Sequence, residues 1–401
     1  MQIKRRVLGE ISQWLDKKKI LILNGARQVG KTTILKEIKK ELEEKNKNCV
    51  YLNLESFQAA DRLNANPDNI FDFIPDKNLF WYVLIDEIQI LDNPSHFLKY
   101  IYDTYDNLKL IITGSANLEI KAKLQDSLAG RKITFYIGPL SLDEILDYEK
   151  LDKKTKNPIE KQKIDKIFEE YLIFGGLPEI YLEKDKEKKK KLLKEYLGTY
   201  VNKDIRALIS KINVSKFNQL NITLSHLIGN LVNKNKISND LNINSRTLDK
   251  YLDLLKYSFI FDFISPYFSN PVTQIKKMQK VYCFDFGVRN AILNNFIEVD
   301  LREDCGKLFE NFVYLKLKEK YQEIFFWRTV KGSEVDFVYQ EDGLNIIEAK
   351  YKKFTAPKTE HSIKQAIKLL QPNKAKIVNL NWNDKIIVGE KEIEFISWEK
   401  I

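Results

Sequence analysis

One motif near the start of the chain limits its fold more than any other feature. Residues 25–32 read Gly-Ala-Arg-Gln-Val-Gly-Lys-Thr and match the pattern G-x-x-x-x-G-K-[ST] in full. The residues before it, Lys19–Gly25, form a short apolar run of the kind found in strands buried on both faces of a parallel sheet. Apolar residues then recur at helical spacing, at Ile34, Leu35, Ile38 and Leu42. A strand, this loop and a helix in that order predict a phosphate-binding loop in an α/β fold.

The residue types of this loop suit a nucleotide. Glycines allow backbone N–H groups to curl around the β-phosphate, and the N-terminus of the following helix adds its positive dipole end. Lys31 is expected to bridge the β- and γ-phosphates, and Thr32 to place its hydroxyl on Mg²⁺. We therefore expect ATP and Mg²⁺ as cofactors, with nucleotide contacts from Gly25, Ala26, Arg27, Gln28, Val29, Gly30, Lys31, Thr32 and Thr33.

A second apolar strand ends in two acids, which hydrolysis requires in addition to the loop. Residues 81–87 read Trp-Tyr-Val-Leu-Ile-Asp-Glu. Asp86 is expected to hold the Mg²⁺ shell. Glu87, directly after it, is expected to polarise the attacking water as general base. This pair predicts hydrolysis of the nucleotide rather than binding alone.

Two other residues are candidates for contact with the γ-phosphate. The apolar run Leu108–Thr113 leads into Gly-Ser-Ala-Asn, where Ser115 is expected to act as a γ-phosphate sensor, with ordinary turn chemistry as the alternative. Arg131 follows Leu-Ala-Gly and is a candidate transition-state arginine, acting in cis or in trans, or else a surface charge. A role in trans would imply a homo-oligomer.

The pattern of strands and helices predicts an α/β multidomain chain. Strand-like runs return at Cys49–Leu54, Trp81–Ile85 and Leu108–Thr113 with helical segments between them, which predicts a doubly wound parallel domain to about residue 150. The polar stretch Leu151–Lys163 is expected to be a linker or loop. Helical periodicity then runs from Ile164 to Leu255, interrupted by a Gly-Gly-Leu-Pro turn.

Short aromatic-rich strands return in the C-terminal part and predict a second α/β or α+β domain. A helical segment, Cys305–Lys320, lies among them. The expected strands are Val281–Phe286, Ile324–Arg328, Glu334–Tyr339 and Leu344–Ala349.

Residues 237–252 have the pattern of a helix-turn-helix, with Ser245 as a candidate N-cap of the second helix. Leu248, Leu252 and Leu255 are expected to face the core. A β-wing is expected near Phe259–Tyr267. Four residues would then lie on an exposed face that can enter a DNA groove: Asn244, Arg246, Thr247 and Lys250. A rigid module that binds protein is the alternative.

Acidic residues on two expected C-terminal strands suggest a metal site. Asp336 lies on one strand, and Glu348 and Lys350 share a face of the next because side chains alternate along a strand. Asp336 and Glu348 could share a divalent metal, while Lys350 positions or deprotonates a water that attacks a phosphodiester. Glu310, on the helical segment, could complete the acidic cluster. Such spacing also arises by chance in charged sequences, so cleavage stays open.

Composition narrows the partners and the location. Lys and Arg number 66 against 56 Asp and Glu, and the resulting charge of +10 favours polyanions such as DNA, although a lysine-rich vocabulary alone could produce it. No window is apolar enough for a membrane span, so we expect a cytoplasmic protein. Three cysteines and three histidines are widely scattered, which disfavours a disulfide framework or a zinc site.

Several motifs together resemble those of archaeal and bacterial AAA-type ATPases that carry a C-terminal domain of unknown function. The resemblance spans nearly the whole chain and implies an AAA-like core, a helical lid, a winged helix and a nuclease-like domain. The motifs are residues 25–32, Asp-Glu-Ile-Gln at 86–89, Thr-Gly-Ser at 113–115, Leu-Ala-Gly-Arg at 128–131, Pro-Leu-Ser-Leu-Asp-Glu at 139–144 and Phe-Gly-Gly-Leu-Pro at 174–178.

The C-terminal acids in turn resemble the PD-(D/E)XK nuclease superfamily. The match comprises the helix with Glu310, the Val-Asp strand and the Glu-Ala-Lys strand, with Val335 in place of the proline of the superfamily's name. The resemblances imply domains at 1–150 (AAA-like ATPase), 151–213 (helical lid or linker), 214–270 (winged helix-turn-helix) and 271–401 (nuclease-like, similar to restriction endonucleases). Two functions remain in competition: an ATP-driven enzyme acting on DNA, and a regulatory ATPase whose C-terminal domains bind protein partners without cleavage.

Overall fold

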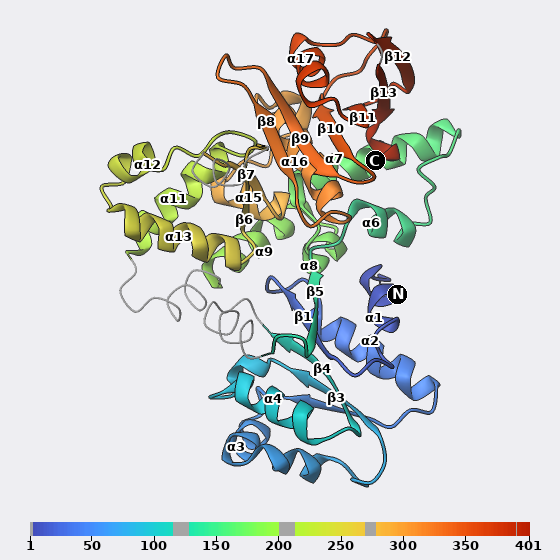
Figure 1. Ribbon diagram of the computed structural model, residues 1–401, viewed down its shortest axis with the longest axis vertical. Helices are drawn as coiled ribbons and strands as arrows, with labels where there is room; N and C mark the ends of the chain where they lie inside the picture. Colours follow the sequence, from blue (N-terminus) through green and yellow to red (C-terminus); the bar gives the residue numbers. More distant parts are fainter. Residues whose placement is uncertain (1–2, 115–127, 200–212, 269–277, 390) are drawn as a thin grey trace.

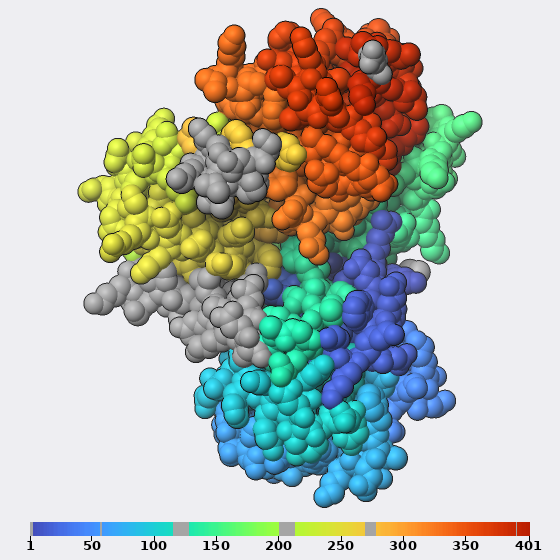
Figure 2. Space-filling model, viewed as in Figure 1, coloured from blue at the N-terminus to red at the C-terminus, as the bar shows by residue number. Residues whose placement is uncertain are grey.

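The computed structural model describes residues 3–114, 128–199, 213–268, 278–389 and 391–401 of the chain. Figure 1 shows two β-sheet regions at opposite ends of an elongated molecule, with helices α11 to α13 beside the upper one. In Figure 2, blue N-terminal residues and green residues lie between the two ends on this face.

The N-terminal region is a five-stranded sheet in the order β2-β3-β4-β1-β5, and all its neighbouring strands are parallel. Four predicted strands are confirmed, and β5 is an addition that the sequence pattern did not reveal. The strands are β1 (Ile20–Gly25), β2 (Cys49–Asn53), β3 (Trp81–Asp86), β4 (Leu108–Gly114) and β5 (Lys132–Ile137).

Helices cover both faces of this sheet, as expected for a doubly wound domain. Leu21 and Leu23 of β1 pack in one hydrophobic cluster with α2, whereas Ile20 and Ile22 pack in another with α4. The helices of this region are α1 (Val7–Ser12), α2 (Lys31–Glu44), α3 (Phe57–Ala65), α4 (Pro94–Thr104) and α6 (Leu142–Tyr148), with short 3-10 turns η1 (Pro67–Phe73) and η2 (Ile88–Ile90).

The middle region is helical as predicted, but its first helix begins earlier than expected. Residues 158–163, assigned to a loop from their polarity, are the first residues of α7 (Pro158–Phe174). The Asn157 side chain accepts a hydrogen bond from the Ile159 N–H at 3.0 Å, and a proline at the first position suits a helix start. The helices that follow are α8 (Pro178–Leu182), α9 (Lys186–Thr199), α11 (Val214–His226), α12 (Lys234–Asp240), α13 (Ser245–Tyr257) and α15 (Phe286–Leu293).

A small two-stranded sheet joins residues on both sides of position 270, where a boundary was expected. Its strands β6 (Phe261–Ile264) and β7 (Lys280–Cys283) are antiparallel. The strand expected at Val281–Phe286 is shorter than predicted, because the Asp285 side chain caps α15 by accepting the Val288 N–H at 2.9 Å.

The C-terminal region is a six-stranded mixed sheet in the order β12-β13-β11-β10-β9-β8. Three of its strands and α16 were predicted, whereas β11, β12 and β13 were not. The elements are η4 (Val299–Leu301), α16 (Cys305–Lys318), β8 (Phe325–Arg328), β9 (Glu334–Gln340), β10 (Leu344–Ala349), α17 (His361–Leu370), β11 (Lys374–Asn379), β12 (Asp384–Val388), β13 (Lys391–Ser397) and η5 (Trp398–Lys400).

One hydrophobic core runs from the first helices to the end of the chain. Phe168 of α7 stacks on Trp398 with ring centroids 4.2 Å apart and meets Phe312 of α16 edge to face at 5.0 Å. The Lys316 ammonium of α16 also pairs with Asp143 of α6 at 2.9 Å. The C-terminal sheet is therefore packed through α16 against the helical middle and against the N-terminal region.

Close backbone approaches at glycines join the N-terminal sheet to the helical middle. A Cβ on Gly176 would lie 2.1 Å from the Leu140 carbonyl oxygen, and one on Gly175 would lie 2.2 Å from Asp285 Oδ1. Two hydrogen bonds of 2.7 Å lie at the same place, from the Leu140 N–H to the Gly176 oxygen and from the Gly176 N–H to Asp285 Oδ2. We call Leu140, Gly175, Gly176 and Asp285 the junction.

This junction predicts a large difference between two glycine substitutions. Gly175 and Gly130 both have positive φ, 74° and 72°, but no atom of the described residues lies within 4 Å of a Cβ at Gly130. Gly130→Ala should cost about 1–2 kcal/mol from backbone strain alone. Gly175→Ala adds a clash with the buried Asp285 carboxylate and should cost roughly 3 kcal/mol more.

Thermal unfolding followed by circular dichroism, together with the yield of folded protein, measures both variants. Equal losses for Gly175→Ala and Gly130→Ala would contradict the tight packing described for the junction.

Candidate functional site

The loop at residues 25–32 connects the carboxyl end of β1 with the first residue of α2. Gln28 and Gly30 have positive φ, 59° and 91°, and Gly30 caps the helix. The Lys31 side chain is buried, and its ammonium donates hydrogen bonds to the Gly25 and Ala26 carbonyl oxygens at 3.0 and 2.6 Å. Thr32 is half-buried, and its hydroxyl makes no hydrogen bond with another described residue. The lysine and the threonine thus lie on the loop that their expected roles require.

Arg5 supports this loop from the N-terminal segment, a role that the sequence did not reveal. Its Nη1 donates to the Val29 carbonyl at 2.7 Å, and its Nη2 donates to the Gly138 carbonyl at 2.7 Å. Its Nε lies 3.2 Å from both carboxylate oxygens of Glu144. No local pattern marks this arginine, because all of its partners are distant in sequence.

The acid pair lies at the carboxyl end of β3, one strand away from β1. The strand between them, β4, ends near Thr113, whose hydroxyl donates to Asp86 Oδ1 and accepts the Glu87 N–H at 3.0 Å. The Tyr51 hydroxyl donates to Asp86 Oδ2 at 2.9 Å. Burial and this contact with Asp86 raise the pKa of Tyr51. Asp86 is therefore fixed by two hydroxyl donors, and neither was predicted.

Glu87 has an unusual backbone for its residue type. Its φ of 58° and ψ of 48° are left-handed, and its Oε2 accepts a hydrogen bond from the Gln89 amide. Non-glycine residues in this region cost free energy and cluster at functional sites. The sharp turn after Asp86 directs Glu87 away from the strand direction while keeping it beside Thr113.

Of the two candidate γ-phosphate residues, Ser115 lies outside the described residues, and Arg131 lies away from the loop. The Arg131 carbonyl accepts the Ile20 N–H at 2.9 Å, which places Arg131 at the amino end of β1. The loop starts at the carboxyl end of the same strand, roughly 16 Å away at 3.3 Å per residue. The Arg131 guanidinium pairs with Asp103 at 2.8 and 3.1 Å. The expected role in cis is therefore wrong for this arrangement.

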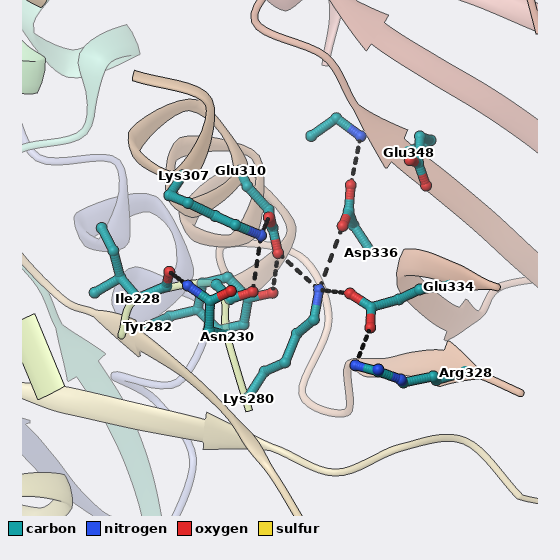
Figure 3. Close-up of polar contacts among 12 residues, drawn as sticks. Ile228, Asn230, Lys280, Tyr282, Lys307, Glu310, Arg328, Glu334, Asp336 and Glu348 are labelled. Carbon is teal, nitrogen blue, oxygen red and sulfur yellow. Dashed lines mark hydrogen bonds and ion pairs between the residues drawn. The ribbon is translucent and has the colours of Figure 1, made fainter. Parts of the chain in front are cut away.

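The C-terminal acids meet around a lysine that no sequence motif marks (Figure 3). The Lys280 ammonium of β7 lies 2.9 Å from Glu310 Oε1, 2.6 Å from Glu334 Oε1 and 3.3 Å from Asp336 Oδ1. Its side chain is only 1% exposed. Burial lowers the pKa of Lys280, but the three carboxylates outweigh this effect and hold the pKa above its ordinary value.

Glu310 was expected to complete a metal site, but the structure surrounds it with hydrogen-bond donors. Its Oε1 accepts from Lys280 and from the Tyr282 hydroxyl at 2.7 Å, and its Oε2 accepts from Lys307 at 2.7 Å. In the part of the chain that is described, no group of three or more Asp, Glu, His or Cys side chains has the arrangement of a metal site. In this structure the acidic cluster holds the side-chain ammonium group of Lys280.

Glu348 and Lys350 lie beside this cluster and line a pocket. Glu348 Oε1 pairs with the Lys350 ammonium at 2.8 Å, whereas its buried Oε2 has no partner among the described residues. Burial, with the charge of Asp336, raises the pKa of Glu348 to about 8. The pocket has a volume of about 260 Å³ and is lined by Glu348, Lys350, Lys352, Phe354, Lys358, Glu360, Ile363 and Ile377.

The helices α11 to α13 and the sheet of β6 and β7 form the region in which a helix-turn-helix was expected. Leu248, Leu252 and Leu255 are buried as predicted, and Arg246 and Lys250 are exposed on α13. The predicted cap is wrong by one residue: Asn244 accepts the Thr247 N–H at 2.8 Å, and Ser245 is the first helical residue.

Three family models match successive parts of the chain. A model described as an AAA domain matches residues 17–146. Two models of domains of unknown function, DUF8612 and DUF4143, match residues 165–298 and 305–401. The first match covers the parallel sheet and its loop, so this part of the chain is an AAA-type P-loop ATPase domain.

Known proteins resemble the chain over most of its length. The uncharacterized protein MJ1544 of Methanocaldococcus jannaschii is 30% identical over 405 residues, 95% of this chain and 88% of that protein. An uncharacterized protein of Haemophilus influenzae is 27% identical over 84% of this chain and 83% of its own length. Among solved structures, AMPPCP-bound DnaA of Aquifex aeolicus matches 62% of this chain and 86% of its own, with 17% identity and a TM-score of 0.28, which carries no argument for function.

Within the described ranges, every helix is too short or too polar to cross a bilayer.

The position of Thr113 predicts its importance for nucleotide turnover. Thr113→Val removes the hydroxyl that holds Asp86 and the Glu87 N–H. Residues that hydrogen-bond to a metal ligand typically change metal affinity or activity by about 10- to 100-fold when they are replaced. We expect a loss of this size in kcat for ATP hydrolysis, measured as phosphate release. Thr113→Ser keeps the hydroxyl and should stay within about threefold of the parent rate, with nucleotide affinity little changed in both.

An unchanged kcat in Thr113→Val would show that the acid pair does not depend on this hydroxyl.

Proposed function

The chain belongs to the same family as the uncharacterized protein MJ1544 of Methanocaldococcus jannaschii, and on this premise we propose that it hydrolyses ATP with Mg²⁺ and acts on DNA. The observation that carries the first part is the placement of Lys31 and the acid pair. The P-loop and the turn at Asp86 and Glu87 both lie at the carboxyl ends of parallel strands, and the Thr113 hydroxyl of the intervening strand donates to the Asp86 carboxylate and accepts the Glu87 N–H.

The residues at this edge fit a nucleotide with its metal ion. Lys31 would exchange its carbonyl partners for oxygens of the β- and γ-phosphates. Thr32 offers a hydroxyl without a described partner, and Asp86 a carboxylate held in place by Thr113 and Tyr51. These two would hold Mg²⁺, which neutralises charge on the phosphates when bound.

Glu87 is the proposed general base. Its carboxylate would accept the proton of the attacking water, and Gln89 fixes its orientation through Oε2. The left-handed backbone at Glu87 supports this role, because it sets the side chain apart from the metal-binding Asp86 that precedes it.

Two substitutions separate binding from hydrolysis. Lys31→Ala should weaken ATP–Mg²⁺ binding in calorimetry by about 10-fold or more and abolish turnover. Glu87→Gln should bind ATP nearly normally but lower kcat by about 10²- to 10⁴-fold, because only the proton acceptor is lost. The exposed Glu44 of α2 provides a matched control, and Glu44→Gln should change neither quantity.

Folded parent protein that gives no heat with ATP and Mg²⁺ would contradict the proposal at its base. Full turnover in Glu87→Gln would leave ATP hydrolysis in place but remove Glu87 as the base.

The DNA part of the proposal rests on charge and exposure. Arg246 and Lys250 lie one turn apart on α13, where both can meet the same groove or phosphate backbone. The net charge of +10 favours a polyanion. In the C-terminal region, the unpartnered oxygen of Glu348 belongs to a pocket whose lining includes three lysines, a combination suited to a phosphodiester. There Asp336 and Glu348 are the proposed metal ligands, and Lys350 the residue that positions water.

One observation favours the second candidate, a regulatory ATPase whose C-terminal regions bind partners without cleavage. Lys280 neutralises the acids that would complete a nuclease site. ATP hydrolysis belongs to both candidates, whereas DNA binding and cleavage belong to the first.

DNA binding can be tested with paired charge removals. The double variant Arg246→Ala/Lys250→Ala should lower affinity for a duplex of about 30 base pairs and reduce the slope of log K against log salt by about 1 to 2. Lys188→Ala/Lys191→Ala removes the same charge from exposed positions on α9 and should have a much smaller effect. Fluorescence anisotropy over a salt series measures both.

Equal losses in the two double variants would indicate binding by net charge alone and would exclude α13 as the recognition surface.

A further inference from the structure

Lys280 reaches the acidic cluster from outside the sheet that carries two of its acids. Glu334 and Asp336 lie on β9, Glu310 lies on α16, and Lys280 lies on β7 of the separate two-stranded sheet. Figure 3 shows its side chain extended toward all three carboxylates. A lysine this deeply buried needs such partners, because an isolated buried charge costs far more than folding can offset.

Each oxygen of the three carboxylates already has a partner. Glu310 uses Oε1 for Lys280 and Tyr282, and Oε2 for Lys307. Glu334 Oε2 contacts Arg328 at 3.2 Å, and Asp336 Oδ2 accepts the Ala349 N–H at 3.0 Å. Their remaining oxygens contact Lys280. A divalent ion could therefore bind these acids only by displacing the ammonium.

Glu348 differs from these three acids because one of its carboxylate oxygens has no partner among the described residues. The residue is only 7% exposed, so water has little access to this Oε2 atom. Asp336 is its neighbour across the β9–β10 pair, since the register pairs Phe337 with Ile347. One metal ligand of the proposed site, Glu348, thus keeps an unpartnered oxygen beside its pair with Lys350, while the other, Asp336, is held by Lys280.

We propose that Lys280 is the resident cation of the C-terminal acidic site and keeps it closed to divalent metal ions. This inference rests on the proposed function of Asp336 and Glu348 as metal ligands and adds the control of that site. Opening requires the β7 ammonium to leave Glu310 and Asp336. Once the ammonium has left, the three carboxylates repel one another, and a divalent metal ion would supply the positive charge that offsets this repulsion.

Manganese binding to the full-length chain tests this proposal without relying on activity. Isothermal titration without nucleotide should give the same Mn²⁺ isotherm for the parent protein and for Asp336→Asn. Lys280→Met should gain one site that binds at least about 100-fold more tightly than any Asp336-dependent binding in the parent, since removing one partner of a buried ion pair leaves its acids uncompensated. Lys280→Met/Asp336→Asn should lose that site again.

Two controls keep the result interpretable. Lys318→Met removes another lysine of the C-terminal region, one that pairs with Asp262 outside the cluster, and should gain no site. If Lys280→Met does not fold, the comparison of the parent with Asp336→Asn remains decisive, because an Mn²⁺ site in the parent that Asp336→Asn lacks would overturn the proposal. A folded Lys280→Met that gains no Mn²⁺ would overturn it as well.

Nicking of supercoiled plasmid with Mn²⁺ separates this proposal from the proposed cleavage. Gain of an Mn²⁺ site in Lys280→Met without nicking supports the resident cation and removes cleavage from the function. Nicking by the parent protein without nucleotide that is lost in Asp336→Asn supports cleavage and overturns the resident cation.

Discussion

The structure depends on places where a glycine lies so close to another part of the chain that a Cβ would not fit. The first residue of the phosphate loop, Gly25, is one of them, since a Cβ there would lie 2.0 Å from the Ile137 carbonyl oxygen at the end of β5. Three residues after Ile137, Leu140 meets Gly176, and Gly175 meets Asp285. The loop geometry is thus set by contacts that continue, through the junction, into the helical middle.

Asp285 shows that the junction carries an electrostatic cost as well as a steric one. Burial raises the pKa of Asp285 to about 6, although the carboxylate accepts the N–H groups of Gly176 and Val288. An unpaired buried carboxylate is costly, so these N–H groups must stay in place for the fold to keep it charged. Asp285 lies two residues after the end of β7. Its hydrogen bonds to Gly176 and Val288 therefore limit how far β7, and Lys280 with it, can shift. Arg5 joins Val29 of the loop to Gly138 at the other end of the same set of contacts.

How much of this was predictable depends on the range of the interaction. The strands β1 to β4 and the P-loop follow from local apolar runs and one motif, and the buried face of α13 follows from helical spacing. The edge strand β5 alternates buried and exposed residues and lacks a continuous apolar run, so it was missed. Arg5, Tyr51 and Lys280 lie far in sequence from their partners, so no local pattern reveals these contacts. For Arg131, a candidate transition-state arginine or surface charge, the motif carries no information on strand direction, which places it at the opposite edge of the sheet.

The role of the Lys280 cluster can be considered in terms of what buried ion pairs contribute to stability and to the positions of the elements that carry them. Replacing such a network with apolar residues of similar volume often leaves stability equal or higher, so stability alone is a weak reason for burying these charges. What the network does fix is position, because an ammonium between three carboxylates tolerates little displacement of β7 relative to β9 and α16. A cation carried on a strand, unlike a metal ion from solution, is present at all metal concentrations and leaves only when its side chain or the strand moves. Along the chain, Asp285 lies two residues after β7, so the strand that carries Lys280 leads directly into the junction beside the N-terminal sheet.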